Sequence, residues 1–517
     1  MVFEGLRFGW SKNTEEWEKT YKRFISFFVD SRSERLVEEL RPTRRTIREF
    51  EAAYLAPGAK VVAVLGLRTG QELRVTESLL QRHIYVQGSI GSGKTTFLKA
   101  LLRGLLARHS ELDKFVIFDP KGDYLKLVRE AGYPYVVVSE NPEFRPVRWN
   151  VFAEILGDSV PDFKVEGNAF LRAVKQSGGR PTFEDLVAKK ELYMRLRKVA
   201  QGIVFTRANL ENVKSSKSDP YFTQNAPASL TEGVLGCLIL DAVSAEHGLG
   251  ALTGVKGLAD LNNRLLARVV AMSDNELRKF LQVYKAYEAG GHIGTDAAAQ
   301  AMGVLSTWRM YMKDIFTLEF AEAGTWSIAK ELRDPGFKVI LLEYRLDNEK
   351  VAIPVFSAIL SNMMDEVLST RLKGRNLYVI LDELHALPKI ESFHTFLNMA
   401  RDLGGKVIAA TQSVAQLYDK YGEQEAKAII SAFNTRVFLR TTDDASLKLV
   451  NDTIGKLLVR RYSKSYSSGR GRESGGESVS HSVEQKEISA LSLSTLPPGV
   501  GLIWTTGGKP ILAPFAQ

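Results

Sequence analysis

Short runs of β-branched and apolar residues recur along the chain, and helical patterns separate several of them. These runs are five to seven residues long, which is the length of buried strands. They occupy residues 61–67, 115–119, 135–139, 338–344, 377–383, 406–412, 436–442 and 501–506. Because strands that alternate with helices form mainly parallel sheets covered by helices on both faces, the pattern predicts an α/β fold.

The strand signals stop between about residues 160 and 330, where one helical pattern follows another. Residues 183–205, FEDLVAKKELYMRLRKVAQGIVF, are an example. A chain of 517 residues is long enough for two or three domains, and the simplest account is an all-α domain inserted into the α/β domain. The predicted parts are an N-terminal helical segment at 1–55, the α/β domain at 56–160 and 331–517, and the inserted domain at 161–330.

A glycine-rich stretch, GSIGSGKTT, lies between an apolar strand pattern at 83–86 and a helical apolar stripe that begins at Phe97. Its spacing is G-x-x-x-x-G-K-[ST], the pattern of a phosphate-binding loop, and a strand before it with a helix after it is the expected context. Backbone N–H groups and the helix N-terminus there face phosphate oxygens. We expect the nucleotide to be bound by Gly88, Ser89, Ile90, Gly91, Ser92, Gly93, Lys94, Thr95 and Thr96.

The last residues of this loop indicate ATP and Mg²⁺ as cofactors. Lys94 is expected to reach the β- and γ-phosphates, and Thr95 to bind Mg²⁺. A glycine-rich turn without a ligand is the alternative, but the flanking strand and helix argue against it.

A second part of the site is predicted at residues 377–390, LYVILDELHALPKI. Asp382 and Glu383 follow an apolar strand, so we expect Asp382 to hold Mg²⁺ and Glu383 to act as the general base toward water. Carboxylates at strand ends also serve as helix caps, which is the alternative. We assign His385 to packing or polar support.

Gln412 ends the next apolar run, so it is predicted to lie in the crevice at the carboxyl ends of the strands. There it can sense the γ-phosphate or orient water, and together with Glu383, Lys94 and an arginine it completes the candidate catalytic set. The alternative role is a buried amide that satisfies loop backbone.

The charge balance suits a polyanionic partner. The chain has 69 Lys and Arg against 60 Asp and Glu, a net charge of +9. Residues 188–217 contain eight Lys or Arg and two Glu, and residues 456–472 contain six and no acid, with Tyr462 and Tyr466 interleaved. These segments are candidate contacts for DNA without sequence preference, although charge runs are more often solvated faces.

The single cysteine, Cys237, rules out a disulfide framework and fits a reducing cytoplasm. We expect no membrane span, because no uninterrupted apolar run reaches about 18 residues.

Taken together, these motifs resemble the type IV coupling proteins of conjugation and type IV secretion, the TraD/TrwB group of the HerA/FtsK-like superfamily. The resemblance covers about residues 80–515, and its most specific run lies at 381–422. Further matching stretches are QRHIYVQGSIGSGKT, VIFDPKGDY, WNVFAEI, SIAKELRDP, RYSKSYSSGRGR and GKPILAPF.

The resemblance implies a RecA-like P-loop motor with an inserted all-α domain, assembled as a homo-hexamer around a channel. It implies DNA-dependent ATP hydrolysis that delivers DNA and its relaxase to a type IV secretion channel. Arg401 matches the position of the family's arginine that completes a neighbouring subunit's site, with a surface arginine as the alternative; Arg436 and Arg440 are weaker candidates. Members usually begin with transmembrane helices, which this sequence does not show. We therefore expect peripheral or partner-mediated attachment at the cytoplasmic face of the inner membrane.

Two other functions stay open at this point. The motor could serve repair or segregation as a HerA/FtsK-like DNA translocase. Alternatively, the protein could be a docking receptor whose assembly is controlled by ATP.

Overall fold

The computed structural model divides the chain into two compact units. The first comprises Met1–Asp113, Asn376–His385 and Phe393–Gln517, and the second comprises Lys114–Arg375 and Ala386–Ser392. The domain boundaries predicted from the sequence stay predictions. The structure describes residues 17, 19, 23, 42–157, 180–212, 220–286, 298–369, 375–390, 392–455, 457–466, 477–486 and 493–515.

The first unit contains a mainly parallel run of strands in the order β13-β12-β9-β3-β8-β7. The four strands β9, β3, β8 and β7 are parallel, and β12 and β13 add antiparallel neighbours at one side. This arrangement confirms the predicted α/β motor fold. The bounds are β3 (Ile84–Gln87), β7 (Leu377–Leu381), β8 (Gly405–Thr411), β9 (Thr435–Phe438), β12 (Val500–Thr505) and β13 (Ile511–Pro514).

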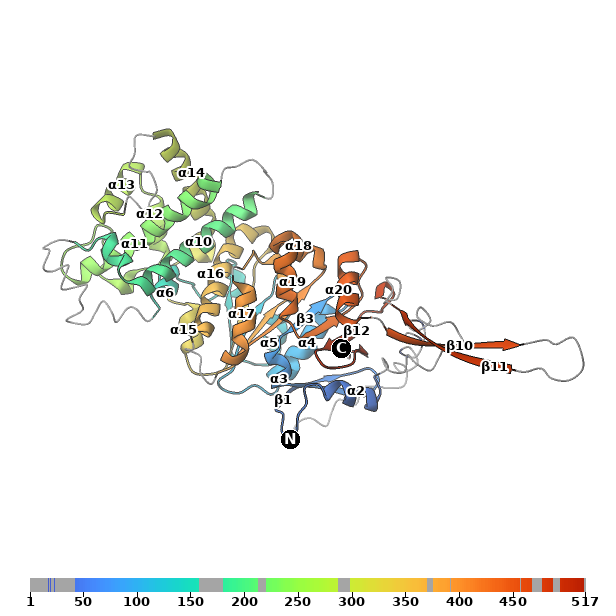
Figure 1. Ribbon diagram of the computed structural model, residues 1–517. Helices are drawn as coiled ribbons and strands as arrows, with labels where there is room; N and C mark the ends of the chain where they lie inside the picture. The colour runs from blue at the N-terminus through green and yellow to red at the C-terminus, as the bar shows by residue number, and fades with distance from the viewer. Residues whose placement is uncertain are drawn as a thin grey trace, which may run out of the picture. The chain divides into compact units, whose positions relative to one another are not determined.

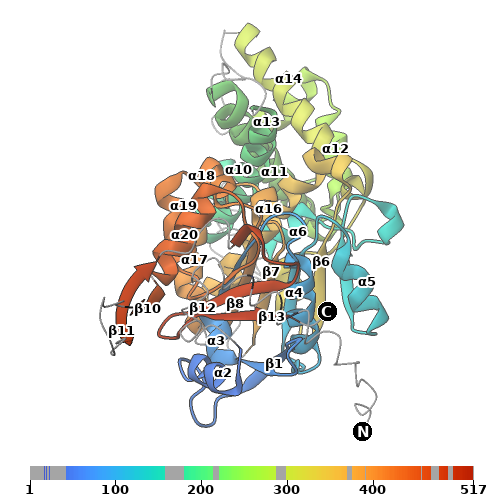
Figure 2. The same ribbon diagram turned by 90° about the vertical axis from the view of Figure 1, so that its right-hand side faces the viewer.

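Helices that follow these strands pack their apolar faces against the sheet. In α4 (Lys94–Leu106) the apolar residues of the predicted stripe, from Phe97 to Leu106, are buried. Helices α18, α19 and α20 lie together in both views (Figures 1 and 2). The other helices of this unit are α2 (Arg44–Glu51), α3 (Glu77–Gln81), α17 (Phe393–Ala400), α18 (Val414–Tyr421), α19 (Glu423–Ser431) and α20 (Asp444–Ile454).

Two smaller antiparallel ribbons complete the first unit. β1 (Val61–Gly66) pairs with β2 (Glu72–Thr76), and β10 (Leu457–Tyr466) pairs with β11 (Glu477–Lys486). The second ribbon is a two-stranded sheet of its own. The basic segment at residues 456–472 falls partly within β10 and partly outside the described residues.

The second unit contains a parallel run of strands and many helices. Its strands are in the order β4-β6-β5, with β4 (Lys114–Phe118), β6 (Lys338–Leu342) and β5 (Tyr135–Val138). Among the described residues from α9 to α14, green to yellow in Figure 1, one helix follows another without a strand, as the sequence predicts. The helices are α5 (Asp123–Glu130), α6 (Val151–Leu156), α9 (Phe183–Val187), α10 (Lys190–Asn212), α11 (Ala226–Glu246), α12 (Asn263–Val270), α13 (Asp274–Val283), α14 (Ala298–Ile315), α15 (Ile328–Arg333) and α16 (Glu349–Leu368).

Two buried asparagines connect three parts of the second unit: the segment that follows β5, the segment around α12, and the segment that precedes β6. The Asn150 amide donates to the carbonyls of Leu261 and Gly324, at 2.8 and 2.9 Å. The Asn263 amide donates to the carbonyls of Trp149 and Phe320, also at 2.8 and 2.9 Å. Since buried backbone carbonyls need donors, these amides fix where the helical segment begins and ends.

Two helical stretches are long and apolar enough to cross a membrane by length and composition, at Tyr221–Glu246 and Leu346–Leu368. The sequence analysis missed them because polar residues interrupt their apolar runs. In the structure, 89% and 78% of the most apolar 18 residues of these two stretches are buried, as in core helices. Cys237 lies fully buried in the first of them.

Two carboxyl groups meet where β4 and β6 end. Asp119 accepts hydrogen bonds from the N–H groups of Asp123 and Tyr124, at 2.9 and 2.7 Å, which fixes the start of α5. Glu343 is 1% exposed and lies against Asp119. Burial, with the charge of Asp119 added, raises the pKa of Glu343 from 4.5 to about 8.

This shift predicts a pH-dependent stability. Between pH 4.5 and 8 the folded protein keeps a proton on Glu343 that the unfolded chain releases. The stabilisation is therefore complete below pH 4.5 and is lost as the pH rises through 8, by at most about 1.4 kcal/mol per pH unit. In Glu343→Gln, the free energy of unfolding should fall less steeply with rising pH. Urea unfolding at pH 5 to 8.5 measures this slope. The control is Glu72→Gln at an exposed position. Equal slopes in the wild type and Glu343→Gln would contradict this account.

Candidate nucleotide-binding site

The phosphate-binding loop connects β3 to α4 through glycines that no other residue could replace without rearrangement. Gly93 caps α4 with φ 99°, in the left-handed region. A Cβ at Gly93 would meet the Gly499 nitrogen at 2.5 Å, and one at Gly88 would meet the Ser92 hydroxyl at 2.5 Å. The loop is therefore closed against its neighbours, with α4 starting directly behind it, as an anion site requires.

Lys94 lies inside the curve of this loop. It is 6% exposed, and its Nζ donates to the Gly88 carbonyl at 2.7 Å. The ammonium is thus held at the concave side of the loop, where phosphate oxygens bind in P-loop proteins.

The acidic pair of the second predicted segment lies beside the loop. Thr95 Oγ1 donates to Asp382 Oδ2 at 3.1 Å, although 287 positions separate the two residues in sequence. A hydroxyl and a carboxylate are hard oxygen ligands of the kind that Mg²⁺ prefers. These residues therefore fit a magnesium ion bound with a nucleotide.

Glu383 follows Asp382 and is held in place by polar side chains. Gln412 Nε2 donates to Glu383 Oε1 at 2.9 Å, and His385 Nδ1 lies 3.2 Å from Glu383 Oε2. Glu383 is 4% exposed and has φ 67°, an unusual backbone conformation for a residue other than glycine. Such conformations cluster at functional sites, where surrounding contacts keep them in place.

Gln412 reaches Glu383 because β8 pairs with β7, and β8 also runs beside β3, the strand that precedes the loop. Gln87, the last residue of β3, is in register with Thr411, the last residue of β8. The side chains that follow these strands therefore meet at one edge of the sheet, in the first unit. The structure thus brings Lys94, Thr95, Asp382, Glu383 and Gln412 together.

Two contacts on the outer side of the loop were not anticipated from the sequence. Arg440 accepts from the Ser89 N–H at 2.8 Å through its carbonyl, and its guanidinium donates to the carbonyls of Ile90 and Gly91 at 3.4 and 3.2 Å. The Gly499 N–H donates to the Ser92 carbonyl at 2.9 Å. Only the PPG sequence at 497–499 hints at a turn, and nothing in the spacing places it here.

The candidate arginines therefore separate into different roles. Arg440 contacts the loop of its own chain. Arg436 donates to Thr453 Oγ1 and to the carbonyls of Phe433 and Ile430, and stacks over Trp504, so its contacts are internal.

Arg401 lies away from the phosphate-binding loop of its own chain. Its charge acts on His83, which precedes β3 and so lies at the opposite end of that strand from the loop. Burial first, and the charges of Arg401 and Lys406 in addition, lower the pKa of His83 to about 4. A site residue at this position can act only on a neighbouring chain, and that role stays a prediction.

Comparisons with known proteins agree with this architecture. The model of the type IV secretion-system coupling protein DNA-binding domain matches residues 255–513, half of the chain. The model of the HerA helicase central domain matches residues 67–201.

Among curated proteins, coupling protein TraD of Escherichia coli (strain K12) is 30% identical over 126 residues. That alignment spans 24% of this chain and 18% of TraD.

Solved structures of the bacterial conjugative coupling protein TrwB share the fold. The unbound TrwBdeltaN70 form has a TM-score of 0.61 at 20% identity and covers 91% of each chain. TrwB in complex with ADP and Mg²⁺ has a TM-score of 0.60 at 20% identity, again with 91% of each chain covered. With half of its residues matched by the family model and its fold shared with TrwB, the chain belongs to the type IV secretion-system coupling protein family.

Proposed function

We propose that the protein is an ATP-driven DNA pump that delivers DNA, with its relaxase, to a type IV secretion channel. The observation that carries the proposal is the contact of Thr95 with Asp382, together with that of Glu383 with Gln412. These contacts unite a phosphate-binding loop, a metal-binding carboxylate and a general base at one edge of the sheet. TrwB structures with ADP and Mg²⁺, and with an analogue of ATP, support ATP and Mg²⁺ as the cofactors.

Each residue has one task in the proposed hydrolysis. Loop N–H groups and Lys94 would bind the phosphates, and Thr95 and Asp382 would hold Mg²⁺, which would supply charge neutralisation for the phosphoryl group. Glu383 takes the proton of the attacking water, and Gln412 orients that water or senses the γ-phosphate. The hydrogen bond between Glu383 and Gln412 links these two tasks.

The partners follow from family membership and charge. We infer a homo-hexamer in which Arg401 of one chain completes the site of the next, because Arg401 lies away from its own loop. DNA without sequence preference, the relaxase and secretion components are the further partners. The expected location is the cytoplasmic face of the inner membrane.

The match to the HerA central domain favours a motor over a docking receptor. It also keeps a HerA/FtsK-like translocase in repair or segregation as the second candidate function. The choice between the two motors depends on the cargo, which relaxase-dependent DNA transfer in cells would identify.

Replacing Glu383 tests the hydrolysis. Glu383→Gln removes the general base while keeping a similar shape, so turnover should fall by about 10²- to 10⁴-fold and binding of a fluorescent ATP analogue should persist. Asp419→Asn, at an exposed position of α18, is the control and should change neither. DNA transfer at the wild-type rate by Glu383→Gln would leave only the receptor role.

Mixing two inactive variants tests the role of Arg401. Arg401→Ala should bind nucleotide but turn it over slowly, whereas Lys94→Ala should bind nucleotide weakly. In mixed assemblies, an intact loop of the first variant can face an intact arginine of the second, so turnover should recover in part. No recovery over any mixing ratio would assign Arg401 to the surface or to its own chain.

A further inference from the structure

The ribbon of β10 and β11 is inserted into the first unit at two points that both touch the phosphate-binding loop. On the entering side, Arg440 follows β9 and bonds to Ser89, Ile90 and Gly91. Three residues later, Asp443 caps α20, whose end at Ile454 precedes β10. The chain therefore passes from the loop contact through α20 to the ribbon.

The returning side makes an equivalent contact. After β11, the chain reaches Leu493 and then Gly499, whose N–H donates to the Ser92 carbonyl at 2.9 Å. Arg68 fixes this turn by donating to the carbonyls of Pro498 and Phe515, both at 3.0 Å. The backbone carbonyls of Ile90, Gly91 and Ser92 are thus held from both roots of the ribbon.

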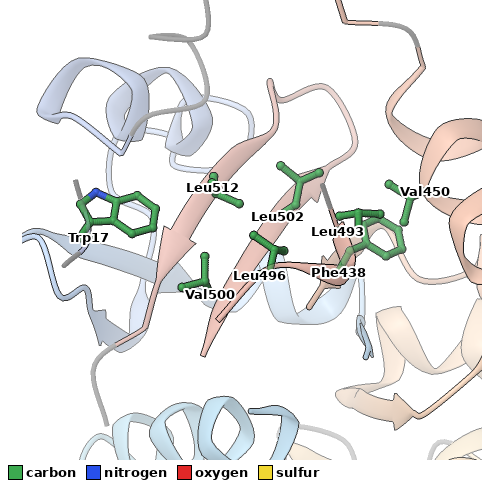
Figure 3. Close-up of a cluster of buried hydrophobic side chains, with 8 residues drawn as sticks. All are labelled: Trp17, Phe438, Val450, Leu493, Leu496, Val500, Leu502 and Leu512. Atoms are coloured by element: carbon green, nitrogen blue, oxygen red, sulfur yellow. The ribbon is translucent and has the colours of Figure 1, made fainter. Parts of the chain in front are cut away.

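A hydrophobic cluster links the two roots (Figure 3). Val450 comes from α20 on the entering side, and Leu493 and Leu496 come from the returning side; all three are at most 2% exposed. They pack with Phe438, which lies two residues before Arg440, and with Val500, which follows Gly499. Because close-packed side chains resist independent movement, the cluster ties the two roots to each other.

The charge of the ribbon is concentrated on one strand. β10 carries Arg460, Arg461 and Lys464 and no acidic residue, whereas Glu477 and Glu484 are on β11. The register places Arg461 opposite Ser482 and Lys464 opposite Val479, so no acid is directly opposite these cations. Arg460 and Lys464 alternate with Tyr462 and Tyr466 along the strand.

Three cations of the other basic segment, in α10, are paired with acids of the second unit. Arg207 is 2% exposed and pairs with Asp314 at 2.5 Å. Lys198 pairs with Asp365 at 2.6 Å, and Arg195 with Glu191 at 3.2 Å. These ion pairs offset part of the positive charge of α10, whereas no acid is directly opposite Arg461 or Lys464 in the ribbon.

We propose that the β10–β11 ribbon is a binding site for the backbone of single-stranded nucleic acid, and that its two roots carry the effect of binding to the phosphate-binding loop. This inference rests on the proposed function and names the element that makes ATP hydrolysis depend on DNA. The positive charge of β10 complements the negative charge of a nucleic-acid backbone. Cations that alternate with aromatic residues suit a single strand, because aromatic rings stack on exposed bases without sequence preference. By linkage, if nucleic acid bound to the ribbon changes the affinity of the loop for nucleotide, then nucleotide changes the affinity of the ribbon for nucleic acid by the same factor.

Removing the charge of β10 tests the binding site. The triple variant Arg460→Gln, Arg461→Gln, Lys464→Gln should weaken binding of a fluorescent oligothymidylate at least tenfold at fixed salt. It should also reduce the slope of log K against log salt by about 2, because each lost phosphate contact on a single strand removes about 0.7. The matched control replaces three exposed cations of the second unit, Lys126, Arg129 and Lys279, with Gln. Equal affinities in the two triple variants would overturn the proposal and leave an acidic protein as the occupant of the ribbon.

A variant at the entering root tests the coupling separately. Arg440→Ala should bind the oligonucleotide as the wild type does, while the ratio of DNA-stimulated to basal turnover should approach one. Arg440→Lys, which keeps a donor, should restore part of the ratio. A full ratio in Arg440→Ala would overturn the coupling. If the wild type hydrolyses no ATP at all, the proposed function fails, the coupling falls with it, and the affinity comparison still decides whether the ribbon binds nucleic acid.

Discussion

The hydrogen bond between Thr95 and Asp382 is the contact on which the candidate site depends. It joins the first residue after the loop lysine to the end of a strand that enters the sequence almost 300 positions later. The contact exists only because parallel strands place their carboxyl ends at one edge of the sheet. The same alignment brings Gln412 to Glu383, and so the phosphate-binding loop, the proposed metal ligand and the proposed base lie together.

The loop is constrained from its outer side as well as from the site. Arg440 and Gly499 hold its carbonyls, and they belong to the two roots of one ribbon. The N–H groups of a phosphate-binding loop and its carbonyls lie on the same peptide planes, so a shift of the outer contacts turns the donors that face the phosphate. In the proposed motor, these hydrogen bonds and the hydrophobic cluster would connect the bound nucleotide to the DNA.

Much of the fold and the core of the candidate site could be predicted from the sequence. Strand-sized apolar runs, with the loop after one and carboxylates after another, indicate an α/β sheet with its ligands at one edge. The remainder depended on contacts that no spacing reveals. The Gly499 N–H donates to the Ser92 carbonyl, although about four hundred positions separate the two residues in sequence. Asn150 and Asn263 connect the helical segment to the residues that flank the strands through hydrogen bonds to backbone carbonyls. Asp314 and Asp365, which pair with two cations of α10, are also distant from that helix in sequence, and the DNA contact expected of this segment stays a prediction.

The central claim is that a nucleotide held beside Lys94 is hydrolysed to move DNA. Steady-state ATP turnover by the wild-type chain, measured with and without single-stranded DNA at one fixed salt concentration, tests this claim most directly. The account predicts Mg²⁺-dependent turnover that rises when DNA is added. Turnover that is present but indifferent to DNA at every salt concentration would contradict it.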